Sequence, residues 1–241
     1  MQIKKLFIAL GIVLPLHMQG QNFLIKDAPE VIESYVNQFN REDNELYKQD
    51  IPNCGASDFL RKNIPFFECP DKELEKTYYF RWWTYRKHIK KTPDGFVITE
   101  FLPDVPWAGK YNTISCAANH HFYEGRWLRN AEILSDYASF WFSGSGNPRL
   151  YSFGAADAIY NYYLIHNDKM LLADLYPKLK DNFAKWEEEK RDSTGMFWQV
   201  DDRDGMEMSV SGHLSEGGRG YRPTINSYMY GEAVALAKIA S

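Results

Sequence analysis

The sequence predicts an all-α protein in which successive helices pack as antiparallel hairpins. Segment after segment repeats its apolar residues at three- and four-residue intervals, and the links between these segments are short. The chain shows no alternation of strands and helices, and the G-G-R-G run at Gly217 lacks the preceding strand that a nucleotide-binding glycine loop needs. With 241 residues, 44% of them hydrophobic, the chain has ample material for a core. One extended segment, residues 96–102, does not change this class.

The clearest expected helix covers residues 71–91. Pro70 and Asp71 form a helix start signal, and basic residues gather at the far end, where they complement the helix dipole. Its apolar stripe contains Leu74 and Trp82, so we expect Trp82 in the core. Residues 53–70 are mixed, and residues 103–110 form a loop. The other expected helices are residues 29–39, 112 to about 127, a segment through 133–141, 153–166, 169–190 and 223–240.

The N-terminus has the parts of a secretory signal peptide. Lys4 and Lys5 supply positive charge, residues 6–16 form an apolar stretch too short to span a bilayer, and Gly20 is a small residue before the expected cut. We therefore expect a signal peptide over residues 1–20, a mature chain over residues 21–241, and a secreted or periplasmic protein. No other segment is expected to cross a membrane.

Charge and cysteine content exclude several classes of function. The net charge is −4 and no basic tract is present, so nucleic acid is not an expected partner. Export permits a disulfide between Cys54 and Cys69, but three cysteines form no recognisable framework, so this pairing is left open. Cys116 lies in an apolar helical context and is expected to be an inert thiol. No Cys/His spacing resembles a zinc site, and neither a metal nor a cofactor is expected.

Residues 198–222 hold the densest group of candidate catalytic side chains. A tryptophan precedes this stretch and a helix follows it, so it is expected to be a long polar loop between packed elements, where catalytic groups are common. Carboxylates beside an aromatic ring indicate carbohydrate chemistry, because glycoside hydrolysis needs a protonated carboxylic acid at the leaving oxygen. An inverting enzyme also needs a second carboxylate that activates water. The carboxylates are Asp201, Asp202, Asp204, Glu207 and Glu216.

Within this stretch, D-G-M-E-M-S at residues 204–209 resembles the G-[M/L/W]-D-x-S motif of inverting six-hairpin glycosidases. This group includes trehalases, processing α-glucosidase I and mannosylglycerate hydrolases. P-T-I-N-S-Y-M-Y-G-E-A-V-A-L-A-K-I-A at residues 223–240 resembles the helix that follows that loop, and Y-N-T-I-S-C-A-A-N-H-H-F at 111–122 resembles an early barrel helix. The resemblance spans roughly residues 78–240 and favours the mannosylglycerate-hydrolase-like glycoside hydrolase domain.

The resemblance implies an (α/α)6 six-hairpin barrel, which is built of twelve helices. Helices of typical length would give this chain about six of them. The helical pattern also runs to Ser241 without a stop signal. We therefore expect residues 21–241 to be about the N-terminal half of the catalytic domain, truncated before the barrel closes.

By the same resemblance, Glu207 takes the position of the general acid, where the family commonly has Asp. Glu can carry out the same proton transfer, and Asp202 or Asp204 are the alternatives. The general base is implied to be a Glu near the end of the barrel, beyond this chain, so a lone half would be inactive. Residues such as Asn119 and His120 replace a Trp-Asp pair that faces the sugar in relatives, so the α-glucoside specificities are not carried over.

Seven further side chains are candidates for substrate binding. Trp198 and Trp107 either stack on a sugar face or pack in the core, and Asp104 lies in the same loop as Trp107. Because His120 and His121 are adjacent on a helix, they cannot face the same side, and we expect His120 to be the one that faces the pocket. The full set is Asp104, Trp107, His120, Glu124, Arg126, Trp198 and Arg222.

The charged members of this set could instead have purely structural roles. Glu124 and Arg126 could equally form an internal ion pair. Arg222 could hold a substrate carboxylate or hydroxyl pair, or it could pair with an Asp of the loop. Asp201, Asp202 and Asp204 could be loop-stabilising hydrogen-bond acceptors.

The leading functional hypothesis is an inverting glycoside hydrolase that acts on an oligosaccharide or polysaccharide. One rival is a polysaccharide lyase on a related helical toroid, which would use Asn119, His120, Tyr123 and Arg126 for proton abstraction beside a uronate. It would release an unsaturated product. The other rival is a non-catalytic carbohydrate-binding protein, which would bind a sugar without turnover.

Overall fold

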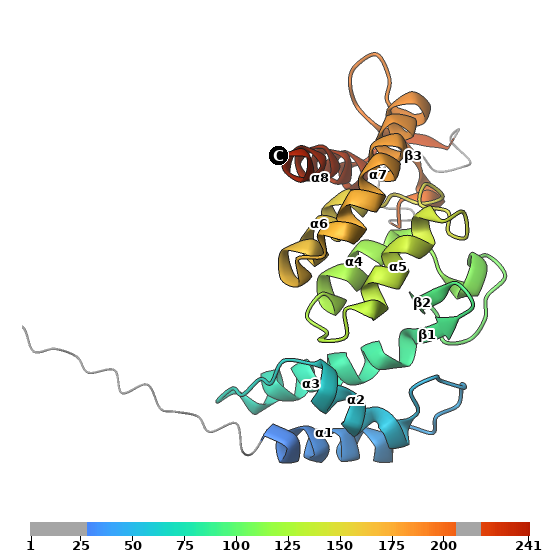
Figure 1. Cartoon of the computed structure of the whole chain (residues 1–241). Coiled ribbons are helices and arrows are strands. Elements are labelled where there is room, and N and C mark those ends of the chain that lie inside the picture. The colour runs from blue at the N-terminus through green and yellow to red at the C-terminus, as the bar shows by residue number, and fades with distance from the viewer. Residues whose placement is uncertain (1–27, 206–217) are drawn as a thin grey trace, which may run out of the picture.

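The computed structural model describes residues 28–205 and 218–241, and helices dominate them (Figure 1). The all-α prediction is therefore confirmed. The expected signal peptide and Glu207 lie outside the described residues. The helices are α1 (Ala28–Glu42), α2 (Asn53–Asn63), α3 (Lys72–His88), α4 (Ser115–Gly125), α5 (Glu132–Phe142), α6 (Ala155–His166), α7 (Lys169–Lys190) and α8 (Pro223–Ala240). Among the described helices, none is long and apolar enough to cross a membrane.

Two short antiparallel hairpins accompany the helices. β1 (Ile89–Thr92) pairs with β2 (Gly95–Ile98), and β3 (Trp198–Val200) pairs with β4 (Arg219–Tyr221). The prediction of a helix through Lys91 was wrong in its last turn, because Ile89 pairs with Ile98 in the first hairpin. Gly95 permits the tight turn, since it adopts a φ of +96° and lies against the Asp136 carboxyl group.

From α4 onward the helices form consecutive hairpins. α6 packs against both α4 and α8, while α7 packs against α6 and α8 (Figure 1). We call α4, α6 and α8 the inner row; each hairpin reverses the chain, so all three begin at the same side of the array. The segments that lead into them are therefore the ones that can build a common site.

Aromatic side chains fill the core between these helices. Phe122 stacks on Tyr137, whose ring also contacts Phe140 and Trp141. Trp82 is buried, as expected from its place on the α3 stripe. Leu74 does not belong to that stripe, because 53% of its surface is exposed and the buried side lies one residue further along the chain, at Glu75 and Tyr79.

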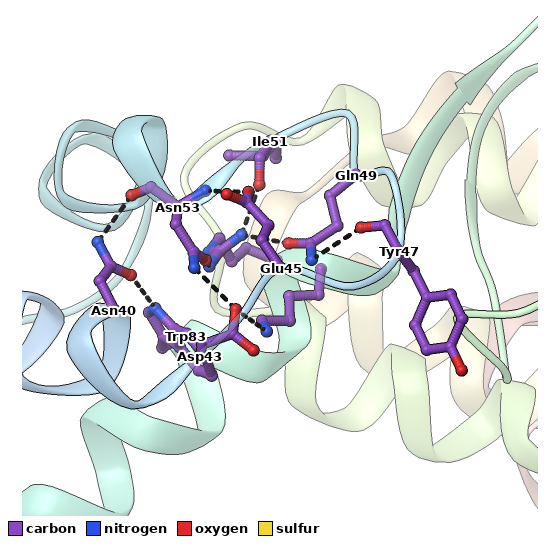
Figure 2. Close-up of polar contacts among 10 residues, drawn as sticks. Asn40, Asp43, Glu45, Tyr47, Gln49, Ile51, Asn53 and Trp83 are labelled. Carbon is purple, nitrogen blue, oxygen red and sulfur yellow. Dashed lines mark hydrogen bonds and ion pairs between the residues drawn. The ribbon is translucent and has the colours of Figure 1, made fainter.

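The N-terminal helices are tied to α3 by a buried arginine. Arg86 donates to Gln49 Oε1 (2.7 Å), to the Ile51 carbonyl (2.5 Å) and to Asn53 Oδ1. Figure 2 shows Asn53 at the centre of this cluster, where its backbone N–H donates to Glu45 and its side chain donates to Asp43. This cluster fixes the segment that leads into α2, a helix that the mixed pattern of residues 53–70 did not reveal.

The cysteines of this region carry no disulfide. Cys54 and Cys69 are both free thiols, Cys54 exposed and Cys69 partly buried.

Candidate active site

The second hairpin, β3–β4, brings the two ends of the carboxylate-rich stretch together. β3 and β4 pair Trp198 with Tyr221 and Val200 with Arg219. The stretch expected to be a loop throughout therefore has strands at both of its ends. Residues 201–205 follow β3 directly, with a short 3-10 turn over Asp201–Arg203, and α8 begins at Pro223, two residues after β4. The two ends of the segment that contains Glu207 therefore lie next to each other.

A buried ion pair joins these two ends. Arg222, at the start of α8, pairs with Asp201, and both side chains are almost fully buried. Its other terminal nitrogen lies 3.9 Å from Oδ2 of Asp204. Of the two alternatives for Arg222, the pair with a loop aspartate is the one that forms.

Asp204 is held from the other side by the segment that leads into α6. Ser152 Oγ donates to Asp204 Oδ1, and the Ser152 backbone N–H donates to the Arg203 carbonyl (2.8 Å). Burial raises the pKa of Asp204, although the hydrogen bond from Ser152 and the nearby Arg222 oppose this rise. Asp202 differs from both neighbours, because 47% of its side chain is exposed and its carboxylate lies 3.9 Å from Arg203.

The described end of the loop lies against the first turn of α4. Gly205 adopts a φ of +69°, and a side-chain carbon there would lie 3.6 Å from Cβ of Cys116. Nearby, the Tyr151 N–H donates to Oγ of Ser115, the first residue of α4. The carboxylate-bearing turn therefore lies over the beginning of the inner row.

Trp198 lies beside a hollow at the base of the second hairpin. The hollow has a volume of about 310 Å³ and is lined by Asp192, Trp198, Arg219, Gly220 and Tyr221. Two cations lie over the indole ring: Lys190 Nζ is 3.9 Å and the Arg219 guanidinium carbon 4.4 Å from its centroid. A sugar that stacks on Trp198 would compete with these cations for the ring.

Tyr221 donates a hydrogen bond to Asp192 in this hollow. That bond is the main cause of the raised pKa of the Tyr221 hydroxyl. Asp192 also accepts from the backbone N–H and hydroxyl of Thr194, and these bonds hold its pKa low. The carboxylate is therefore ionised and held in place at neutral pH.

The candidate residues of α4 divide between several environments. His120 is exposed, one turn beyond Cys116 on the same side of the helix. His121 instead packs against Tyr137. Glu124 pairs with Arg81 of α3 rather than with Arg126, at 2.7 Å. Of these candidates, only His120 lies on the side of α4 where Cys116 faces Gly205, and it forms no hydrogen bond or ion pair with the residues that the structure describes.

Arg126, which follows the last residue of α4, contacts α6 rather than Glu124. Its Nη1 donates to Asn161 Oδ1 of α6 at 2.9 Å. It is therefore an interhelical contact in this structure.

The two candidates in the loop before α4 have surroundings that contain none of Arg222, Asp201 and Asp204. Asp104 lines a small hollow of about 40 Å³ together with Lys48 and Lys90, and that hollow contains none of these three residues. Trp107 is 59% exposed and meets Phe101 edge to face, so it is not a core residue.

Sequence reasoning missed several polar residues of the inner row. Ser152 holds Asp204, and Asp157 and Glu232 join α6 to α8 through the Asp157 N–H, which donates to Glu232 Oε1 at 3.0 Å. One signal was available for Glu232, because it is a charged residue at the helical spacing of the apolar positions Ile225 and Met229. No group of three or more His, Cys, Asp or Glu in residues 28–205 and 218–241 is arranged to hold a metal ion.

Comparison with known proteins identifies the family. A sequence model of the mannosylglycerate hydrolase MGH1-like glycoside hydrolase domain matches residues 110–241, which is more than half of the chain. The chain belongs to this family. It is therefore a glycoside hydrolase domain of the six-hairpin type, and the resemblance seen in the sequence is confirmed. The matched region begins at the loop before α4 and includes the whole inner row.

A solved structure named a sialidase is similar to this glycoside hydrolase domain. The two share 40% sequence identity and superpose with a TM-score of 0.80 over 88% of this chain. The chain spans 20% of the length of that structure. No curated protein matches the sequence.

Proposed function

We propose that this glycoside hydrolase domain carries the acid side of an inverting active site, with Glu207 as the general acid. The observation that supports this role is the buried Asp201–Arg222 pair, which joins the two ends of the segment that contains Glu207. Glu207 follows Gly205 by two residues, and two residues of chain span at most about 7 Å. A fixed Gly205 therefore restricts where this carboxyl group can act, as proton transfer to a leaving oxygen requires.

The surroundings of the other carboxylates favour supporting roles for two of them. A general acid must come within hydrogen-bond reach of the leaving oxygen. Asp204 has the raised pKa that such an acid needs, but its side chain is buried and accepts a hydrogen bond from Ser152. Asp201 is paired with Arg222. Asp202 is accessible and is the alternative acid.

The substrate follows from the family only as a class, a glycoside of an oligosaccharide or polysaccharide. The names of the matched family and of the similar structure define a first panel of mannosylglycerate and a sialoside. Trehalose is added because the motif at residues 204–209 also resembles that of trehalases. Proton NMR of the first product formed shows which anomer is released. The proposed mechanism requires inversion, and release of the retained anomer would contradict it.

The acid assignment is tested by Glu207→Gln in the protein as it is naturally produced. We expect turnover to fall roughly 10²- to 10⁴-fold, because the amide cannot protonate the leaving oxygen. Glu216→Gln, in the same segment, is the matched control and should retain activity. An unchanged rate in Glu207→Gln would remove this residue from the acid role, and a large loss in Asp202→Asn would then assign the acid to Asp202.

We also propose that the protein is exported to a secreted or periplasmic location. The support is the order of charged, apolar and small residues in the first twenty positions. N-terminal sequencing of the protein from the producing cells should find a mature start near Gln21. A mature protein that still begins at Met1 would refute export by this route.

A further inference from the structure

The side of α4 that lies against Gly205 carries further polar side chains, away from the carboxylates described above. Cys116, His120 and Tyr123 follow one another at helical spacing on α4, and none of the three is fully buried. Cys116 lies against Gly205 of the acid-bearing turn. Tyr123 is therefore about two turns of helix away from that turn, on the same side of α4.

Tyr123 reaches across to the next inner helix. Its hydroxyl donates to Oδ2 of Asp157, which lies in the first turn of α6. Asn161 Nδ2 donates to the other oxygen of Asp157 at 3.3 Å. No lysine or arginine of the described residues forms an ion pair with Asp157. A carboxylate has about four acceptor positions, so two remain for further donors.

A third helix, α8, holds the backbone of Asp157 in place. Glu232 of α8 is fully buried and accepts the Asp157 backbone N–H at 3.0 Å. The first turn of α6 is thereby held by α8 while the Asp157 side chain is held by α4 and α6. Groups that are positioned in this way by their neighbours are preorganised for binding, since little ordering remains to be done when a ligand arrives.

We propose that Tyr123 and Asp157 form a subsite that binds the hydroxyl groups of an uncharged sugar ring. Asp157 accepts hydrogen bonds from two neighbouring hydroxyls, and Tyr123 sets the direction of the carboxylate. An acidic sugar is disfavoured here, because its carboxylate would face the Asp157 carboxylate. A neighbouring cation, Arg126, lies over the Tyr123 ring and already donates to Asn161 Oδ1 rather than to Asp157. This subsite rests on the proposed function in requiring a carbohydrate substrate, but it does not depend on which residue is the acid.

The test compares two variants with a matched control in the naturally produced protein. Tyr123→Phe removes only the hydroxyl, and Asp157→Asn removes the charge while keeping the shape. Tyr160→Phe is the control, because Tyr160 is a half-buried tyrosine of α6 whose ring contacts Tyr163 and Lys238 instead. The probes are the glycoside hydrolysed in the panel above and the methyl glycosides of glucose, mannose and galactose, whose binding is measured by calorimetry.

We expect KM, or Kd for the methyl glycoside that binds, to rise roughly ten- to hundredfold in Asp157→Asn, as the loss of hydrogen bonds to a charged group predicts. Tyr123→Phe should give a smaller rise, kcat should change little, and Tyr160→Phe should match the wild type. Deoxy analogues of the bound glycoside provide the decisive readout. Removing a contacted hydroxyl should weaken binding to the wild type but not to Asp157→Asn.

Each other outcome overturns the subsite. If both variants lower the melting temperature but leave KM, Kd and the deoxy discrimination unchanged, the pair only joins two helices. Failure of the wild type to bind any of these probes also refutes the proposal. If turnover survives Glu207→Gln while the Asp157 effects appear, the acid assignment fails and the subsite stands.

Discussion

At the scale of single residues, the environment of Glu232 decides its charge. The carboxyl group is buried between α6 and α8, and this burial raises its pKa from 4.5 to about 8. The nearby Asp157 adds to the rise, while the backbone N–H groups of Asp157 and Ala156 oppose it. Glu232 is therefore mostly protonated at neutral pH in the folded protein and ionised in the unfolded chain.

This difference predicts how stability depends on pH. Between about pH 4.5 and pH 8 the folded state holds a proton that the unfolded state has lost, so stability falls as the pH rises through this range. Glu232→Gln keeps the acceptor and cannot ionise. Relative to the wild type, it should become more stable by a few kcal/mol, on the order of the pKa difference, between pH 5 and pH 8.

Urea unfolding at a series of pH values measures this effect. Glu188→Gln serves as the control, because Glu188 is an exposed residue of α7. A difference between Glu232→Gln and the wild type that stays constant from pH 5 to pH 8 would show that Glu232 is ionised in the folded state.

At the scale of elements, α3 carries one arginine on its exposed side and one on its buried side. Arg81 lies on the exposed side and pairs with Glu124. Arg86 is fully buried and donates to three neutral oxygens, two in the segment before α2 and one on Asn53, the first residue of α2. Arg86 also lies over the Trp83 ring, with its guanidinium carbon 5.0 Å from the ring centroid. If Arg81 is removed, water can hydrogen-bond to its partly exposed partner Glu124. If Arg86 is removed, water has little access to its buried partner Asn53.

The same substitution at these two positions should therefore have different effects. Arg86→Met removes the donor of the buried Asn53 oxygen and of the partly buried Gln49 oxygen. We expect it to destabilise the protein by roughly 2–4 kcal/mol. Arg81→Met should cost about 1 kcal/mol or less, because exposed ion pairs contribute little. Chemical denaturation of both variants tests this, and equal losses of stability would contradict the structural role of Arg86.

At the scale of the whole molecule, the repeated helical hairpins bring the segments that precede α4, α6 and α8 to the same side of the array. Because α4, α6 and α8 run in the same direction, the segments before them converge on Gly205, Tyr151 and Ser152. The outer helices α5 and α7 return the chain and supply core aromatic residues. The protein therefore separates its stable core from the polar segments that carry candidate functional groups.

Much of this arrangement could be predicted from the sequence because the relevant signals are local. The bounds of α7 and α8 follow from their 3–4 spacing, and the family follows from a contiguous motif with its helix. Local signals failed where a pairing partner decided the structure. Residues 89–91 continue a helical pattern but form a strand because β2 lies beside them, and Arg126 and Glu124 found partners other than each other.

By itself, then, the sequence determined the helical class, the family and the stretch in which the acid is sought. Only the tertiary structure decided which carboxylates are buried, which arginine neutralises Asp201, and that Tyr123 meets Asp157. The reason is physical: these contacts join residues 21 positions apart for Arg222 and Asp201, 34 for Tyr123 and Asp157, and 75 for Glu232 and Asp157. Helical periodicity fixes which face of one helix is apolar, but packing alone determines which polar groups of different helices come together.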